Sequence, residues 1–288
     1  MEFIKYNSRK KFLEENLEIL LEQEARNEVL IGIVLQHKEE KVDNWLLGRI
    51  ENGDKIEIIF GVDDDKNGLL MYLPDNKLNK QALELLFDNI VRLNIKLDEV
   101  VVISEYAEMV REVCLEKINR EITKSSLAYI YKLEKLKEDN IKLNDDKKII
   151  KLENNDKYLS QIIPIVKEIF VDTYKQEPCS DEEAERLAKI YLKKGTYILT
   201  DSNEEKIYTQ VVNVRNQVNG ATIGAVITPR EFRSKGYGKI GITAICNKIL
   251  ENKDFISLHV SPRNEAALAL YKKIGFEKNT EIVIIKFA

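Results

Sequence analysis

The order of predicted helices and strands occurs twice along the chain, and this repeat limits the possible folds more than any other feature. Apolar residues at helical spacing, among them Leu13, Leu17 and Leu20, predict that helices open the first half. Apolar runs bounded by turn residues then predict three strands, a helix, a strand, a helix and a strand. Asn52-Gly53 predicts a tight turn that joins the first two of these strands in a hairpin. We expect these elements at 45–50, 56–62, 68–73, 80–93, 100–104, 105–118 and 127–133.

The second half gives the same order. A short strand and two helices, which begin near Tyr158 and Asp181, come first. Aligning Ser104 with Ser261 places a strand on a strand and lets the next helix run in phase without a gap. We favour duplication, while shared architecture without duplication stays open. The remaining elements are expected at 196–200, 207–214, 221–228, 238–251, 255–260, 264–274 and 282–287.

Chain length agrees with two domains. The 288 residues exceed the usual size of one domain, about 100–200 residues. With 44% hydrophobic and 33% charged residues, the composition is that of an ordered globular chain. Lys, Asp, Glu and Asn dominate residues 135–148, which predicts a linker. We therefore expect an α/β (α+β) fold with domains at 1–136 and 147–288 and a linker at 137–146.

Composition disfavours several functional classes. Three cysteines without a CxxC pair, and only two histidines, predict neither a disulfide framework nor a metal site. The longest apolar stretch, Val29–Leu35, is too short to cross a membrane, and we expect a cytoplasmic location because the start resembles no secretory leader. No basic run indicates nucleic acid. Residues 1–145 carry 30 acidic and 22 basic side chains, and residues 146–288 carry 19 and 23, so the second half suits an anionic ligand better.

A glycine-containing segment between a strand and a helix is the first candidate site. Residues 227–239, here called the cradle, contain Arg233, Lys235, Gly236 and Gly238 directly before an apolar helix. Glycines let backbone N–H groups approach a phosphate closely, a helix N-terminus adds positive partial charge, and the Arg and Lys side chains add full charges. The pattern predicts an anion-binding loop. A tight turn that only starts a helix is the competing interpretation.

A helix that begins at an asparagine and carries a tyrosine near its end is the second candidate. Asn264 is suited to cap this helix and Gly275 to end it. Leu270, Tyr271 and Ile274 fall on one face. Taken alone, Tyr271 on that face is interpreted as a core residue with a satisfied hydroxyl.

Together the two segments resemble the two central motifs of the GCN5-related N-acetyltransferase (GNAT) superfamily in order, spacing and element context. The motifs cover about 221–276, the fold-level resemblance covers about 148–288, and residues 1–136 resemble the family only in element order, as a degenerate second domain. The resemblance implies two GNAT-like domains, each with a mixed, mostly antiparallel sheet flanked by helices. The matching residues are Arg233-x-x-Gly236-x-Gly238 and Asn264-x-x-Ala267-x-x-Leu270-Tyr271-x-Lys273-x-Gly275-Phe276.

The resemblance also implies a cosubstrate and residue roles. Acetyl-CoA would donate the acetyl group, and its pantetheine arm and thioester would pair with the backbone of Ala225, Val226 and Ile227 on a splayed strand. Asn264 would contact the pantetheine region, and Tyr271 would lie beside the thioester sulfur and protonate the departing thiolate. Backbone amides would hold the pyrophosphate of coenzyme A at Arg233, Ser234, Lys235, Gly236, Tyr237, Gly238 and Lys239.

The general base stays unassigned in the sequence. Some members of the superfamily place a carboxylate on the strand before the cradle, but residues 221–227 contain none. A structural role is the stronger interpretation for each alternative, and a water chain would also serve. Cys246 is interpreted as a core residue rather than a nucleophile. The alternatives are Glu177, Asp181, Tyr208 and His259.

The first half lacks the cradle. Residues 75–79 contain no glycine, and Asp75 would repel a pyrophosphate. Cys114 stands where the second half has Tyr271. We expect that this domain does not bind acetyl-CoA, and three roles stay open: covering the acceptor cleft, stabilising the catalytic half, or recognising a partner.

The sequence thus predicts an acetyl-CoA-dependent N-acetyltransferase with one catalytic domain, in which an amine attacks the thioester directly. A small-molecule acceptor is favoured over a protein, while the acceptor's identity, the acyl-chain length and homodimer formation stay open. The alternative is a non-catalytic CoA-binding module with a regulatory or protein-interaction role.

Overall fold

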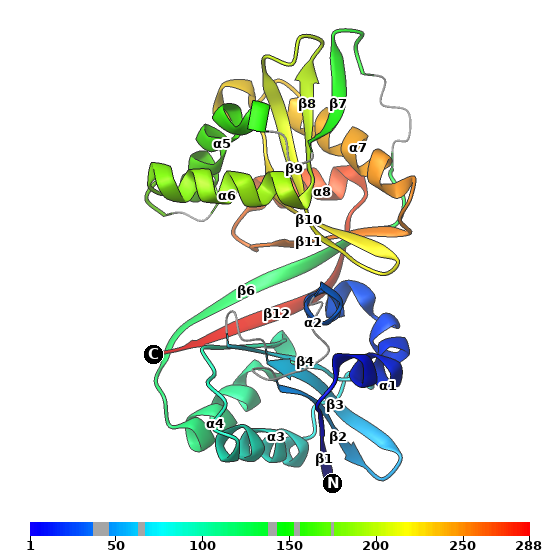
Figure 1. Cartoon of the computed structure of the whole chain (residues 1–288), viewed down its shortest axis with the longest axis vertical. Helices are drawn as coiled ribbons and strands as arrows, with labels where there is room; N and C mark the ends of the chain where they lie inside the picture. The colour runs from blue at the N-terminus through cyan, green and yellow to red at the C-terminus, as the bar shows by residue number, and fades with distance from the viewer. Residues whose placement is uncertain (37–45, 63–66, 138–142, 153–155, 174–175) are drawn as a thin grey trace. The chain divides into compact units, whose positions relative to one another are not determined.

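The computed structural model describes residues 1–288 apart from 37–45, 63–66, 138–142, 153–155 and 174–175 (Figure 1). The chain forms two compact units. Unit 1 comprises residues 1–130 and 279–288, and unit 2 comprises residues 131–278. The model thus has two α/β units, each with a mixed sheet flanked by helices, as expected.

Unit 1 is a mixed sheet with four helices in its described residues. The strands are hydrogen-bonded in the order β1-β2-β3-β4-β5-β12-β6, and of the registers described here β4–β5 is the parallel one. Gly53, at a φ of 62°, forms the predicted turn between β2 and β3. The elements are β1 (Glu2–Tyr6), α1 (Arg9–Leu21), α2 (Glu24–Gln36), β2 (Leu46–Asn52), β3 (Lys55–Val62), β4 (Gly68–Tyr72), α3 (Lys80–Arg92), β5 (Glu99–Ile103), α4 (Ala107–Ile118) and β6 (Ile122–Leu133).

Unit 2 repeats this order. Its strands are hydrogen-bonded in the order β11-β10-β9-β8-β7, with β10–β11 parallel and the other described registers antiparallel. The pair α5 and α6 covers one side of these strands, and α7 packs on β9 and β8 from the other side (Figure 1). The elements are β7 (Lys147–Leu152), α5 (Leu159–Asp172), α6 (Asp181–Lys194), β8 (Thr196–Asp201), β9 (Ile207–Asn216), β10 (Gly220–Ile227), α7 (Tyr237–Leu250), β11 (Phe255–Val260) and α8 (Glu265–Ile274). The strand that completes the repeat, β12 (Glu277–Phe287), belongs from Asn279 onward to unit 1.

The last strand differs from the expected domain division. The expected boundaries follow the chain order, whereas residues 279–288 group with unit 1. There β12 pairs antiparallel with β5, with Ile282 opposite Ile103, and Val283 and Ile285 enter the core that α3 and α4 also build. The apolar pattern predicted this strand correctly, but such a pattern does not specify which distant strand it will pair with.

Strand β1 was not expected. Its sequence, Glu2–Tyr6, has five residues, is bounded by no glycine or proline, and lies at the edge of the sheet beside β2. So short a segment carries little periodicity, and its pairing with β2 decides its conformation. Leu13, Leu17 and Leu20 lie in helix α1 as predicted, and Ser8 accepts a hydrogen bond from the Lys11 backbone at its start.

The described helices are all too short or too polar to cross a membrane.

Candidate functional site

Strands β10 and β11 pair along only part of their length. The parallel register runs from Gly220–Phe255 to Ile223–Leu258, although β10 continues to Ile227 and β11 to Val260. The backbone of β10 beyond Ile223 therefore has no register partner in β11 within the described pairs. This is the splayed geometry that the resemblance implied.

A bulge interrupts the pairing of β10 with β9, on the other edge of β10, in the same stretch of residues. Gly224 lies opposite Val212 and Ile227 lies opposite Gln210, so β10 has one residue more than β9 here. Ala225 has a φ of 45°, in the left-handed region that costs an alanine about 1 kcal/mol. Because of the bulge on one side and the separation of β11 on the other, Ala225 is in register with neither strand, and its carbonyl accepts from the Gln210 side-chain amide at 3.4 Å.

The cradle begins the helix α7 without a side-chain cap. Gly236 occupies the N-cap position at φ 85° and ψ −12°, and Ser234 also has a positive φ, 60°. A glycine has no side chain that could accept a hydrogen bond from the first turn of the helix. Gly236 therefore does not cap the backbone N–H groups of Tyr237, Gly238 and Lys239. With the positive end of the helix dipole, these groups form an anion-binding concavity.

Two further glycines fix the position of α7. A Cβ on Gly238 would lie 3.0 Å from the Thr228 hydroxyl oxygen, and a Cβ on Gly241 would lie 2.6 Å from the Cβ of Thr209 on β9. Gly241 thus lets α7 pack closely on the sheet. Sequence reasoning missed this residue, although with Gly236 and Gly238 it completes a G-x-G-x-x-G spacing that could have identified it.

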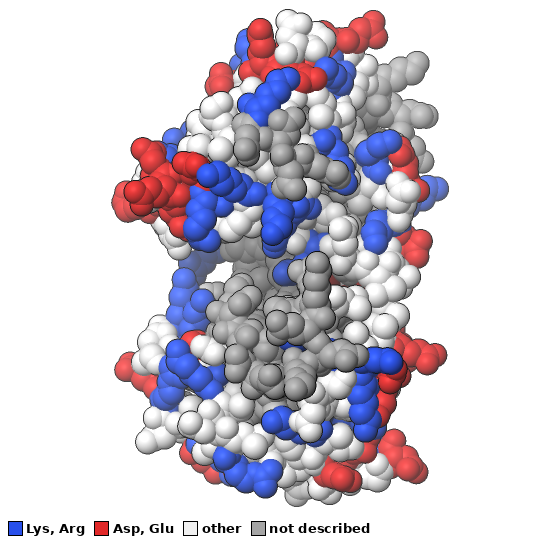
Figure 2. All heavy atoms as spheres, viewed as in Figure 1, with Lys and Arg blue, Asp and Glu red and all other residues white. Residues whose placement is uncertain are grey.

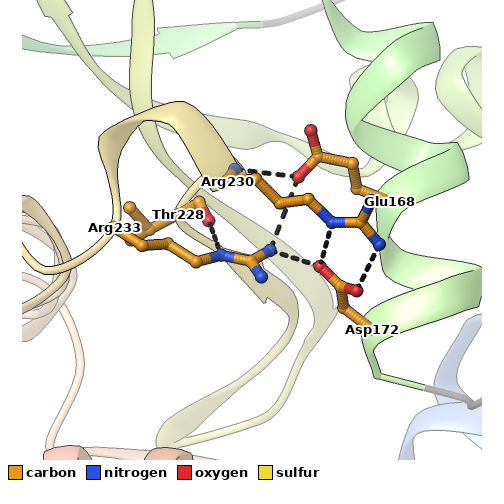
Figure 3. A network of polar contacts seen from close by, with 5 residues as sticks. All are labelled: Glu168, Asp172, Thr228, Arg230 and Arg233. Atoms are coloured by element: carbon orange, nitrogen blue, oxygen red, sulfur yellow. Dashed lines mark hydrogen bonds and ion pairs between the residues drawn. The ribbon is translucent and has the colours of Figure 1, made fainter.

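Two arginines of the cradle form ion pairs with α5 (Figure 3). The Arg230 guanidinium donates to both oxygens of Asp172, at 2.6 and 3.0 Å, and an Nη of Arg233 lies 2.6 Å from Asp172 Oδ2. Arg233 Nε also donates to the Thr228 carbonyl at 2.8 Å. Glu168 accepts from the backbone N–H of Arg230 at 3.0 Å. The hydrogen bonds from Arg230 and Arg233 lower the pKa of Asp172 to about 2.

This network changes the expected role of the Arg233 side chain. Its charge is directed at α5 and at the loop's own backbone, whereas the sequence interpretation gave it to the anion as well. The backbone amides and the helix N-terminus are consequently the anion-binding groups that the geometry of the cradle favours.

Tyr208, one of the candidates for the general base, packs against two aromatic rings of the cradle. Its ring centroid lies 4.7 Å from that of Phe232 and 4.5 Å from that of Tyr237, and the residue is 8% exposed. The Lys147 ammonium lies 4.6 Å from the Tyr208 ring. These contacts give Tyr208 a packing role, since they hold Phe232 and Tyr237 of the cradle against β9.

Helix α8 carries both residues predicted for it. The Asn264 side chain accepts from the Ala267 backbone N–H at 3.2 Å, so it caps the helix, and Leu270 reaches the vicinity of Gly238 in the cradle. Tyr271 is 7% exposed, and its ring lies 5.4 Å from that of Phe276 between centroids, at an interplanar angle of 59°. Burial, with a smaller contribution from Cys246, raises the pKa of Tyr271. The phenol therefore stays protonated, as a proton donor must.

The other base candidates have structural surroundings. Asp181 forms an ion pair with Lys167, whose hydrogen bond lowers the pKa of Asp181, and Ser180 rather than Asp181 caps α6. Glu177 and His259 are exposed. None of these contacts assigns a general base. In the part of the chain that the structure describes, no cluster of three or more His, Cys, Asp or Glu side chains could hold a metal ion.

Unit 1 differs from unit 2 at the equivalent loop. The Asn79 side chain accepts from the Gln81 backbone at 3.0 Å, so α3 begins with a side-chain cap where α7 has a glycine. Asn76 is held from two sides, by Arg26 at 2.6 Å and by the Tyr106 hydroxyl at 2.9 Å. At the start of α3 a side-chain oxygen thus accepts from a first-turn N–H, whereas α7 has no such side-chain cap.

Comparison with known proteins agrees with this geometry. Residues 204–285 match the family model described as FR47-like protein. No curated protein matches the chain. Solved structures align over nearly its whole length at low identity, which indicates a shared fold. An acetyltransferase from the GNAT family from Colwellia psychrerythraea aligns with a TM-score of 0.55 and 13% identity over 100% of both chains.

Two more structures extend the comparison. A GCN5-related N-acetyltransferase from Sphaerobacter thermophilus aligns with a TM-score of 0.60 and 12% identity over 98% of this chain and 94% of its own. A tandem GNAT protein from the clavulanic acid biosynthesis pathway aligns with a TM-score of 0.55 and 10% identity over 99% and 97%. The chain is therefore a two-unit protein with the GNAT acetyltransferase fold.

Proposed function

We propose that unit 2 is an acetyl-CoA-dependent N-acetyltransferase acting on an amine, with a small molecule favoured as acceptor. One observation carries the proposal: the uncapped N-terminus of α7 lies directly after a strand that is bulged at Ala225 and separated from β11 beyond Ile223. An anion site next to an unpaired strand edge suits a ligand with a pyrophosphate and an extended amide-containing arm.

The backbone groups of the cradle and of β10 suit the pyrophosphate and the amide-containing arm of coenzyme A. The first-turn amides at Gly236–Lys239 would hold the pyrophosphate, and the backbone of Ala225–Ile227 would pair with the pantetheine arm. Asn264, which caps α8, would keep its place beside that arm. Acetyl-CoA supplies the activated acyl group, and the chain's own groups bind, orient and exchange protons.

The transfer is a direct displacement. The neutral amine nitrogen attacks the thioester carbonyl carbon, and backbone N–H groups of the bulged strand stabilise the developing oxyanion. Cleavage of the C–S bond expels the thiolate, to which Tyr271 donates its proton, while the nitrogen loses a proton to water or to an unassigned base. Cys246 takes no part as a nucleophile, because it is fully buried and burial raises the pKa of its thiol.

The test is a calorimetric titration with acetyl-CoA followed by a thiol-release assay on a panel of amines. Gly236→Asp should abolish binding, because it places a side chain at φ 85° and a negative charge where the pyrophosphate would lie. Gly53→Asp is the matched control: that glycine also has a positive φ, 62°, and an added Cβ would meet nothing within 4 Å. Absence of binding to the wild-type chain, or equal effects of the two variants, would refute the proposal.

A second candidate is a CoA-binding module that does not catalyse transfer. It is favoured by the absence of any carboxylate in β10. This module would bind acetyl-CoA and release no thiol with any amine. Turnover that falls on Tyr271→Phe while acetyl-CoA binding persists would exclude it.

We further propose that unit 1 does not bind acetyl-CoA. The capped start of α3 supports this, since an anion there would have to displace the Asn79 side chain from the Gln81 backbone N–H. Titration of the full chain should give one acetyl-CoA site, and two sites of similar affinity would contradict the assignment.

A further inference from the structure

We propose that unit 2 contains a second anion-binding site, for a small molecule with a chain of two or more phosphate groups, at the end of α7 opposite the cradle. The site is a pocket of about 480 Å³ whose walls come from β7, α6, β9 and the end of α7. Five lysines line it: Lys151, Lys193, Lys194, Lys248 and Lys253.

Positive charge in this pocket exceeds what the neighbouring helices explain. Lys193, Lys194 and Lys248 lie in the last turns of α6 and α7, where a cation favours the helix dipole. Lys151 belongs to β7 and Lys253 follows α7, so the dipoles do not account for these two. Figure 2 shows the same polarity along α6, with acidic side chains at its beginning and basic ones toward its end.

The described lining of the pocket contains no Asp or Glu. Lys253 donates to the neutral Gln217 carbonyl at 2.8 Å, and the Lys151 ammonium lies 6.0 Å from the centre of the Tyr197 ring. Lys248 pairs at 2.7 Å with Glu251, a residue outside the lining. A polyanion in the pocket would be attracted by several of these ammonium groups at once. The side chains of Asn216 and Asn252 add neutral donors to the lining.

The pocket is separate from the cradle. Helix α7 has 14 residues, a length of about 21 Å, with the cradle at its first residue and Lys248 in its last turn. A phosphate chain in the pocket would therefore not overlap with the pyrophosphate of coenzyme A. The size of the pocket suits a triphosphate group or a nucleotide better than a single phosphate.

The experiment is calorimetry of the full chain with sodium tripolyphosphate, performed with and without saturating coenzyme A. We expect one binding event that persists with coenzyme A present and weakens about threefold or more at 0.5 M salt. Lys193→Glu should weaken it about fivefold or more, because an attraction becomes a repulsion. Lys253→Gln, tested separately, should also weaken it. A parallel titration with ATP distinguishes the ligands: tighter binding assigns the pocket to a nucleotide, and equal binding to the phosphate chain alone.

Lys206→Glu is the matched control. Lys206 is exposed and precedes β9, whereas Asn216 at the far end of this 10-residue strand lines the pocket, about 30 Å away. No binding of tripolyphosphate to the wild-type chain, or equal losses in the pocket variants and in Lys206→Glu, would overturn the proposal. Because the Lys193→Glu comparison is also made without coenzyme A, it stands even if the proposed acetyl-CoA site fails its own test.

Discussion

Replacement of Asp172 by Asn tests whether the arginine network positions the cradle. The substitution keeps the shape of the side chain and removes the charge that receives Arg230 and Arg233. We expect weaker acetyl-CoA binding in a folded chain, because the loop before Gly236 would lose its attachment to α5. Activity at saturating acetyl-CoA should change much less than the affinity.

The magnitude follows from the pKa of Asp172. A decrease from 3.8 to about 2 corresponds to an interaction of roughly 2.4 kcal/mol between the carboxylate and its surroundings. The side chains of Asp172, Arg233 and Arg230 are 23%, 38% and 54% exposed, so solvent screens part of this, and about 1 kcal/mol is the appropriate value. If that energy organises the loop, the dissociation constant for acetyl-CoA should rise about fivefold.

Calorimetric titration with acetyl-CoA measures this change, and thermal unfolding monitors the fold. Asp88→Asn is the control, since Asp88 forms a 2.9 Å ion pair with Lys117 in unit 1. Its acetyl-CoA affinity should equal that of the wild type. An unchanged affinity for Asp172→Asn would refute the positioning role, as would an equal loss in the control.

Three other predictions address the proton donor, the packing of α7 and the acid stability of unit 2. Tyr271→Phe should lower the turnover number about 100-fold at unchanged acetyl-CoA affinity, and an unchanged turnover number in the thiol-release assay would remove Tyr271 from the mechanism. Gly241→Val should lower the free energy of unfolding by about 1–3 kcal/mol in urea titrations, because its Cβ would meet Thr209, and wild-type stability would contradict this packing. Hydrogen bonds from Lys148 and two further groups lower the pKa of Glu204 to about 2, so its stabilisation is present above pH 4.5 and lost as the pH falls toward 2. Glu204→Gln should thus be less stable than the wild type at pH 7 and differ little from it near pH 2, whereas a constant difference in urea titrations would argue against the network.

Local sequence signals predicted most elements because their causes are local. The Asn52-Gly53 turn and the glycine that ends α8 act within a few residues, and the structure places both where the sequence did. The pairing of β12 with β5 and the bonds from Arg233 to α5 join residues far apart in the chain. Neither follows from periodicity, because partner choice depends on the complete packed structure.

The candidate site shows the same limit. The sequence predicted Gly236 at the start of a helix and Tyr271 on a helix face, and the structure has both there. It did not predict the bulge at Ala225, since an alanine has no sequence signal for a positive φ. That conformation is maintained by the surrounding strands, which a linear pattern does not describe.

Comparison of the two units distinguishes what the fold contributes to an anion site from what the residues at the helix start contribute. In both units a helix connects the two strands of a parallel pair, so topology alone would provide an anion site in each. In unit 1 the Asn79 side chain occupies the helix start and Arg26 holds Asn76, whereas in unit 2 Gly236 leaves the first-turn amides uncapped and the arginines pair with α5. The difference between a closed and an open helix N-terminus is thus made by a few side chains, and these residues, rather than the sheet, direct the proposed chemistry to unit 2.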